Sequence, residues 1–142
     1  MTLIVDASVA VKWFTAETGH EQAMRLRFSN APLWSPEFVV VETLNVIWKK
    51  LKRGEMSAPQ AMAVPEALQA CFDRLVPASE YSQSALALAR KLDHSVYDCC
   101  YLACATLYEA VLVTEDVEFM RKARLHGYGN RLRRLADWES VG

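Results

Sequence analysis

Short apolar runs that alternate with longer segments of helical periodicity constrain the fold of this chain more than any other feature. Residues 3–5 (Leu-Ile-Val) and 111–113 (Val-Leu-Val) are short, wholly apolar and typical of buried strands. Residues 33–34 and 75–76 are further candidate strands, and residues 131–135 predict an edge strand. Short apolar strands that alternate with helices are typical of a parallel sheet covered on both faces. We therefore predict an α/β fold.

Segments of helical periodicity fill the intervals between these strands. Ser35 and Pro36 are interpreted as the N-cap and first residue of a long helix that reaches about residue 53. Residues 57–60 form a capping box for the next helix, in which Pro65 predicts a kink or break. The remaining helices are expected over residues 9–14, 20–28, 79–92, 95–108 and 116–123.

Bulk properties limit the classes of protein to which the chain can belong. A length of 142 residues fits one domain over residues 1–142, and we see no repeat or linker. The composition is 52% hydrophobic and 23% charged with a net charge of −1, which excludes wholesale disorder and a uniformly basic nucleic-acid binder. No apolar run approaches the roughly 20 residues of a membrane span, and Asp6 interrupts the first apolar stretch too early for a signal peptide. We expect a cytoplasmic protein.

The cysteines and histidines give little support to a site of their own. Adjacent cysteines on a helix point about 100° apart and cannot be bridged, and a zinc site needs paired ligand spacings that are missing here. We interpret the thiols as core residues and the histidines as incidental. The residues concerned are Cys71, Cys99, Cys100, Cys104, His20, His94 and His126.

Two aspartates follow apolar strands directly or closely. Asp6 comes after the strand at residues 3–5, and Asp116 lies three residues after Val113. Open α/β sheets bind ligands just beyond the carboxyl ends of their strands. These positions therefore predict a ligand site, although helix N-capping is an alternative interpretation of Asp116.

Two further acids lie on helix faces that the pattern predicts to be buried. Glu42 falls inside the apolar arc of its helix, where a salt bridge to Lys49 is the alternative explanation. Asp98 lies in the first turn of an almost wholly apolar helix, where Ser95 and Asp98 form an alternative capping box. Each acid alone has an ordinary explanation, but four together are harder to dismiss.

A divalent cation would compensate such a cluster. Two carboxylates about 4 Å apart repel each other by roughly 4 kcal/mol at an effective dielectric constant near 20. Mg²⁺ and Mn²⁺ accept hard oxygen ligands and need neither histidine nor cysteine. A cation held in this way generates a hydroxide and stabilises a phosphoryl transition state, which is the chemistry of phosphodiester cleavage.

The same residues carry a resemblance to a known family. Residues 5–9 (Val-Asp-Ala-Ser-Val), Glu42 after Ser35-Pro36, Tyr97-Asp98 and residues 113–119 (Val-Thr-Glu-Asp-Val-Glu-Phe) together resemble the PIN domain. The similarity is closest to VapC-type toxins of bacterial toxin–antitoxin pairs and covers about residues 3–138. It implies an α/β/α sandwich with a central, mainly parallel sheet, a Mg²⁺ or Mn²⁺ site, and endoribonuclease activity on RNA.

The resemblance also assigns roles to residues. It implies that the metal-binding and catalytic acids are Asp6, Glu42, Asp98 and Asp116, with Ser8 and Thr114 as nearby hydroxyls. Many relatives carry another aspartate two residues after the last acid; this chain has Glu118 there, and we leave it outside the core site. Toxin-like relatives dimerise and bind a small antitoxin protein, so we expect a homodimer and an antitoxin complex. Apolar helix residues that need not all reach the core motivate this expectation: Trp13, Phe14, Trp48 and Leu51.

Basic residues supply possible phosphate contacts. Residues 119–134 contain no acid, and with residues 49–53 they carry ten cations that can form local positive patches. These are Lys49, Lys50, Lys52, Arg53, Arg121, Lys122, Arg124, Arg131, Arg133 and Arg134.

Other functions remain open or are disfavoured by particular residues. A haloacid-dehalogenase-like phosphatase needs a second aspartate at position 8, which is serine, and the chain has no glycine-rich phosphate loop. A phospho-accepting receiver domain would need its acceptor aspartate at a later strand. Two alternatives remain: a PIN fold used as a non-catalytic binding module, and a PIN nuclease of RNA or DNA processing outside a toxin–antitoxin system.

Overall fold

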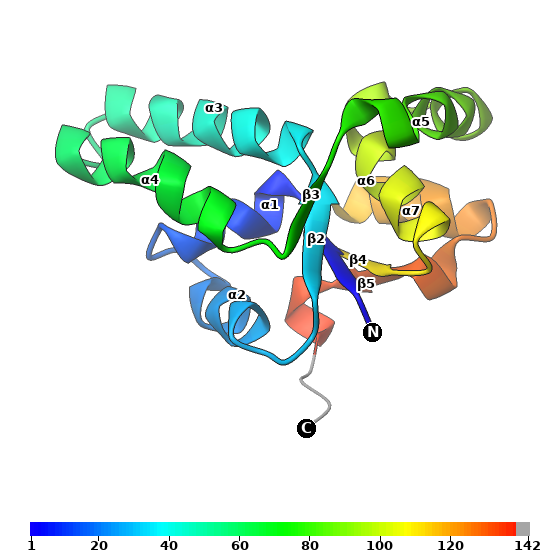
Figure 1. Ribbon diagram of the computed structural model, residues 1–142, viewed down its shortest axis with the longest axis horizontal. Coiled ribbons are helices and arrows are strands. Elements are labelled where there is room, and N and C mark those ends of the chain that lie inside the picture. The colour runs from blue at the N-terminus through cyan, green and yellow to red at the C-terminus, as the bar shows by residue number, and fades with distance from the viewer. Residues whose placement is uncertain (139–142) are drawn as a thin grey trace.

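A five-stranded parallel sheet forms the centre of the protein in a computed structural model that describes residues 1–138 (Figure 1). The spatial order of the strands is β3-β2-β1-β4-β5, and every neighbouring pair is parallel. This confirms the predicted α/β fold with a parallel sheet. The strands are β1 (Leu3–Val5), β2 (Leu33–Pro36), β3 (Arg74–Val76), β4 (Val111–Thr114) and β5 (Leu132–Arg134).

Helices cover both faces of this sheet, so the protein is an α/β/α sandwich. Figure 1 shows the sheet nearly edge-on, with α1 to α4 on one side and α5 to α7 on the other. The first group is α1 (Ala7–Ala10), the short 3-10 helix η1 (Val11–Trp13), α2 (His20–Arg27), α3 (Phe38–Lys52) and α4 (Ala58–Ala70). The second is α5 (Ala78–Leu92), α6 (Val96–Leu107) and α7 (Val117–Leu125), and the 3-10 helices η2 (Gly129–Arg131) and η3 (Leu135–Asp137) flank β5.

The order of the strands creates a switch point in the middle of the sheet. From β1 the chain adds β2 and β3 on one side, and it then returns to the other side of β1 to add β4 and β5. The register pairs Leu3 with Val111 and Val5 with Val113, so β1 and β4 end side by side. We call this end of the sheet the carboxyl edge. A crevice forms where the strand order reverses, and ligands of open α/β folds bind there.

The predicted N-cap at Ser35 is wrong, because Ser35 and Pro36 belong to β2. α3 begins later, at Phe38, after Glu37 in the N-cap position. Ser35 is fully buried, and its hydroxyl donates to the Val5 carbonyl at 2.7 Å. A serine before a proline satisfies the local rules of a helix start equally well. The hydrogen bond from the Ser35 hydroxyl to Val5 therefore decides between a strand and a helix start.

Pro65 does not break its helix, so that part of the prediction is wrong as well. α4 runs through Pro65 to Ala70 and packs along α3, and such tertiary packing overrides the local preference of proline against a helix interior. The capping box at its start is confirmed. Gln60 Oε1 accepts from the Ser57 backbone nitrogen at 3.0 Å, and Ser57 Oγ accepts from the Gln60 nitrogen at 3.3 Å.

The thiols belong to the core, as predicted. All four cysteines are free, and Cys99, Cys100 and Cys104 are buried on α6. Burial raises the pKa of Cys99 and of Cys104 to about 12, so these thiols stay protonated and unreactive. Within residues 1–138, none of the helices combines the length and the apolar character needed to span a membrane.

Candidate active site

Asp6 occupies the innermost position at the carboxyl edge, directly after β1. Its side chain is 8% exposed, and Oδ1 accepts from the Ser8 hydroxyl at 2.5 Å and from the Val9 backbone nitrogen at 3.3 Å. Oδ2 accepts from the Thr114 hydroxyl. Burial and, to a smaller extent, the charge of nearby Glu42 raise the pKa of Asp6 to about 7, even though these donors favour its charged form.

Thr114 connects Asp6 with Asp116. It is fully buried at the end of β4, and its Oγ1 donates to Asp6 and accepts from the Asp116 backbone nitrogen at 3.1 Å. Asp116 is the N-cap of α7, where Oδ1 accepts from the Phe119 nitrogen at 3.0 Å. The capping interpretation of Asp116 is therefore confirmed. It engages only Oδ1, however, and no hydrogen bond to Oδ2 exists among the residues that the structure describes.

Glu42 faces this group from α3. It is half-buried, and Oε1 accepts from the hydroxyl of Tyr101 on α6 at 2.6 Å. Burial raises the pKa of Glu42, and the charge of Asp98 raises it further. The alternative salt bridge is wrong, because no ion pair within residues 1–138 joins Glu42 to Lys49, which is exposed.

Asp98 completes the group from the first turn of α6. Ser95 holds the N-cap position but makes no capping hydrogen bond with its side chain, so the alternative capping box is wrong. Asp98 Oδ2 instead lies 2.6 Å from Nε2 of His94, whose ring packs against Phe119 at a centroid distance of 4.9 Å. His94, Asp98 and Asp116 each offer one possible metal-ligand atom, and these three atoms all lie within 4.8 Å of one another.

The structure thus brings the four predicted acids together at the carboxyl edge. Hydrogen bonds through Thr114 join Asp6 to Asp116, charge repulsion couples Glu42 to Asp6 and Asp98, and Asp98 and Asp116 approach each other directly. No lysine or arginine among residues 1–138 forms an ion pair with any of them. Such a set of carboxylate oxygens without a balancing side-chain cation fits a hard divalent ion.

Sequence reasoning missed two residues of this region. We interpreted His94 as incidental, yet it pairs with Asp98, and Tyr101 was not singled out although it binds Glu42. The spacing of Tyr101, three residues after Asp98 on the same face of α6, was an available signal, whereas His94 lies before α6 begins and no helical spacing indicates it.

Two of the basic residues that we singled out pair with acids. Lys50 pairs with Glu17 at 3.1 Å, and Arg121 pairs with Glu118 at 2.7 Å. Glu118 is itself exposed, so its carboxylate faces solvent and Arg121 rather than the acids. Arg134 is exposed and pairs in register with Thr114, the last residue of β4, so it lies at the carboxyl edge.

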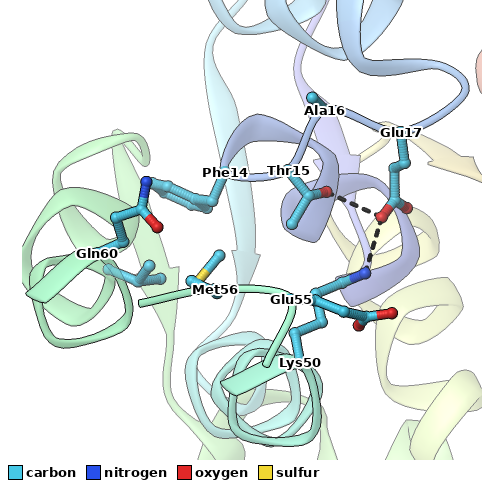
Figure 2. A pocket seen from close by; sticks show the side chains of 9 residues that line it. Phe14, Thr15, Ala16, Glu17, Lys50, Glu55, Met56 and Gln60 are labelled. Carbon is cyan, nitrogen blue, oxygen red and sulfur yellow. Dashed lines mark hydrogen bonds and ion pairs between the residues drawn. The ribbon is translucent and has the colours of Figure 1, made fainter. Parts of the chain in front are cut away.

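A separate cavity of about 610 Å³ lies away from these acids (Figure 2). It is lined by residues 14–17, the end of α3 and the start of α4. Figure 2 shows Glu17 between Thr15 and Lys50. Glu17 Oε2 accepts from the Thr15 hydroxyl at 2.9 Å and pairs with Lys50 Nζ at 3.1 Å. None of the four acids lines this cavity. The candidate site is therefore the carboxyl edge and not the cavity.

Comparison with known proteins finds similar sequences and structures. The model of the PIN domain family matches residues 3–125. Ribonuclease VapC3 of Pyrobaculum aerophilum is 32% identical over 124 residues, which span 86% of this chain and 95% of the relative.

Solved structures share the fold at lower sequence identity. The protein PAE2754 of Pyrobaculum aerophilum superposes with a TM-score of 0.69 at 21% identity, over 96% of this chain and 85% of the other. A chain of a toxin–antitoxin complex from Klebsiella pneumoniae superposes with a TM-score of 0.59 at 17% identity, over 82% of this chain and 88% of the other. At these identities the likeness establishes the fold.

Proposed function

Because this chain belongs to the PIN domain family, we propose that it is an endoribonuclease that acts with Mg²⁺ or Mn²⁺ as the toxin of a toxin–antitoxin pair. Its ribonuclease relative matches nearly end to end, which supports RNA as the substrate. The proposal treats residues 1–142 as one domain and places the protein in the cytoplasm, together with its substrate.

One observation carries the proposal: four carboxylates from separate elements meet at the switch point of the sheet without a lysine or arginine partner among residues 1–138. We assign metal binding and catalysis to Asp6, Glu42, Asp98 and Asp116. A purely structural cluster would be destabilising, because its members repel one another and Asp6 is almost fully buried.

The surroundings of each acid indicate its role in the proposed reaction. When bound, the cation supplies an activated water and stabilises charge on the phosphoryl oxygens. Asp6 is held rigidly by Ser8 and Thr114, so it keeps its orientation whether or not the substrate is bound. Asp98 and Asp116 are partly exposed, and they face the side from which a phosphodiester can approach.

Charge-removing substitutions test the assignment. Asp6→Asn and Asp98→Asn keep the shape of each side chain, and each should reduce RNA cleavage by about a hundredfold or more, because an interaction that stabilises the transition state is lost. Glu118→Gln is the matched control, since Glu118 lies in the first turn of α7, two residues after Asp116, but pairs with Arg121. The assay follows cleavage of labelled RNA with Mg²⁺, with Mn²⁺ and with chelator.

Metal binding is measured separately from activity. Mg²⁺ or Mn²⁺ should raise the melting temperature of the wild-type protein, as a ligand of the native state does, and should raise that of Asp98→Asn less. Full cleavage by both Asn variants contradicts the site assignment. If the wild-type protein neither cleaves RNA nor shows a higher melting temperature with metal, the alternative of a non-catalytic binding module is favoured.

We also propose a homodimer and an antitoxin partner. The fold is shared with a chain of a toxin–antitoxin complex, and α3 exposes Val41 and Trp48 seven residues apart on one face. Trp13 does not contribute to such a surface, because it is buried and its Nε1 donates to the Ala23 carbonyl at 2.9 Å. A strict monomer in light scattering at high micromolar concentration contradicts the dimer. Co-purification from the native cell identifies the antitoxin.

A further inference from the structure

Two aromatic rings are stacked at the margin of the acid site. Phe38, the first residue of α3, and Tyr97, on the first turn of α6, lie with ring centroids 5.4 Å apart and an interplanar angle of 16°. Phe38 is half-buried, whereas Tyr97 is 63% exposed. The hydroxyl of Tyr97 has no hydrogen-bond partner within the described part of the chain. Tyr97 therefore contributes a mostly exposed ring to the surface.

This pair is continuous with the acids. Phe38 also packs against Tyr101 at a centroid distance of 6.2 Å, and Tyr101 donates to Glu42. Tyr97 directly precedes Asp98 in the sequence. An aromatic path thus runs from the exposed ring of Tyr97 to the carboxylate of Glu42.

Exposed apolar side chains lie close to three of the acids in the sequence. Val41, Val96 and Val117 are 62, 40 and 56% exposed at the starts of α3, α6 and α7, which lie at the carboxyl edge. The carboxylates repel a polyanion, and the net charge of −1 gives little general attraction for one. Uncharged contacts at this margin would add affinity for nucleic acid that the acids themselves cannot supply. A planar base that stacks on an aromatic ring supplies such a contact.

We propose that Tyr97, supported by Phe38, forms a stacking subsite for one unpaired base of the substrate, next to the phosphodiester that reacts at the acids. This inference rests on the proposed ribonuclease function and deepens it, because it makes single-stranded RNA the preferred form of the substrate. A paired base keeps its neighbours within the duplex and cannot stack on Tyr97 without being unpaired.

Binding without cleavage tests the subsite. The full-length protein is titrated, in chelator, into a labelled 12-nucleotide single-stranded RNA of mixed sequence and into an abasic oligomer of the same length. Tyr97→Leu keeps an apolar side chain and removes the ring, and it should weaken binding of the RNA roughly five- to a hundredfold. Tyr97→Phe restores the ring and should recover most of the affinity. The abasic oligomer should bind weakly to all variants.

Controls separate stacking from loss of structure. Phe28→Leu removes another exposed ring, at the end of α2, and should leave RNA binding unchanged. Melting curves confirm that each variant is folded. Equal RNA affinity of Tyr97→Leu and wild type, or equal affinity of wild type for RNA and abasic oligomer, overturns the inference. A change of oligomeric state in Tyr97→Leu without a change in RNA binding also overturns it and assigns Tyr97 to a protein contact.

The same proteins distinguish failure of the inference from failure of the proposed function. If the wild-type protein cleaves RNA but binds the RNA and the abasic oligomer equally well, the proposed ribonuclease function stands and the stacking subsite is wrong. If the wild-type protein binds the RNA more tightly than the abasic oligomer but cleaves RNA with neither metal, the stacking subsite stands and the proposed nuclease function is wrong.

Discussion

The inner and outer walls of the acid site are built differently. Asp6 on the inner wall is buried and receives three hydrogen bonds, two of them from hydroxyls. Asp98 and Asp116 on the outer wall are partly exposed, and each makes one contact with its side chain besides their mutual approach. The inner wall is thus fixed by the fold, and the outer wall is left open to ligands.

This difference shows how one site combines rigidity with access. A buried carboxylate costs stability, and its hydrogen bonds offset only part of that cost, as the raised pKa of Asp6 shows. A cation would offset the remainder. The outer acids retain contact with water, so they cost the fold less. We therefore expect substitutions of the inner wall to act on the stability of the metal-free protein, and those of the outer wall to act mainly on binding.

The largest expected effect is the pH dependence of the metal-free protein. The pKa of Asp6 is about 7 in the folded state against 3.8 for the unperturbed group, so the folded protein keeps a proton that the unfolded chain releases between these values. The contribution of Asp6 to stability is complete below about pH 4, falls as the pH rises through 7, and stays low above it. Asp6→Asn should therefore be more stable than wild type at pH 8, by as much as a few kcal/mol.

Denaturant unfolding in chelator at pH 5 and pH 8 measures this effect. Asp98→Asn serves as the matched variant of the outer wall, and its stability relative to wild type should change little between the two pH values. If the free energy of unfolding of both variants depends on pH in the same way, the proposed difference between the inner and outer walls is wrong.

The next effect compares two buried threonines. Thr114→Val removes one of the three donors to Asp6 and leaves the Asp116 backbone nitrogen without its acceptor, so it should lower the free energy of unfolding by about 1–3 kcal/mol. Thr43→Val is the control, because the Thr43 hydroxyl is buried without a hydrogen-bond partner in residues 1–138. The control should be neutral or stabilising. Thermal or denaturant unfolding of both variants tests the comparison, and a Thr114→Val protein as stable as the control contradicts it.

His94 provides the sharpest test of the outer wall. Its Nε2 fixes one oxygen of Asp98, so His94→Gln should weaken Mg²⁺ or Mn²⁺ binding about ten- to a hundredfold with little change in fold. The matched control is His126→Gln, because His126 is exposed and bonds only to the Lys122 carbonyl among the described residues. Titration calorimetry measures the affinity. If His94→Gln binds the metal ion as tightly as the wild type, His94 only packs against Phe119 and does not support metal binding.

The smallest effect concerns phosphate contacts. Arg134 lies beside Thr114 at the carboxyl edge, whereas Arg53 follows the far end of α3. Arg134→Gln should weaken RNA binding a few-fold and lower the slope of log affinity against log salt by about one. Arg53→Gln should change neither quantity. Equal effects of the two substitutions in a salt series would indicate diffuse attraction rather than a contact.

The strands and their terminal acids were predictable, because a short apolar run that ends in aspartate is a strong local signal. Asp6 and Asp116 lie where the strand pattern placed them. Glu42 was predictable from helical geometry, since it falls inside an apolar arc. The sandwich and the parallel sheet followed from the alternation of elements.

The errors arose where a distant partner decides the structure. The hydroxyl of Ser35 binds Val5, thirty residues away, and nothing in the neighbouring sequence separates this from a helix cap. His94 lies in the connection between α5 and α6, after Asp93 takes a left-handed conformation with φ of 52°. That backbone turn brings the ring back to Asp98, and residue types alone do not specify it.

The hydrogen bond between Asp6 and Thr114 also has a consequence for how the protein is made. It joins residues 108 positions apart, and β1 cannot acquire its second neighbour until β4 has been synthesised. Contacts of such long sequence separation form late and slowly during folding. The inner wall is therefore among the last parts to assemble during synthesis. A nascent or truncated chain that ends before β4 has no complete acid cluster, so under the proposed assignment of the active site it would lack ribonuclease activity.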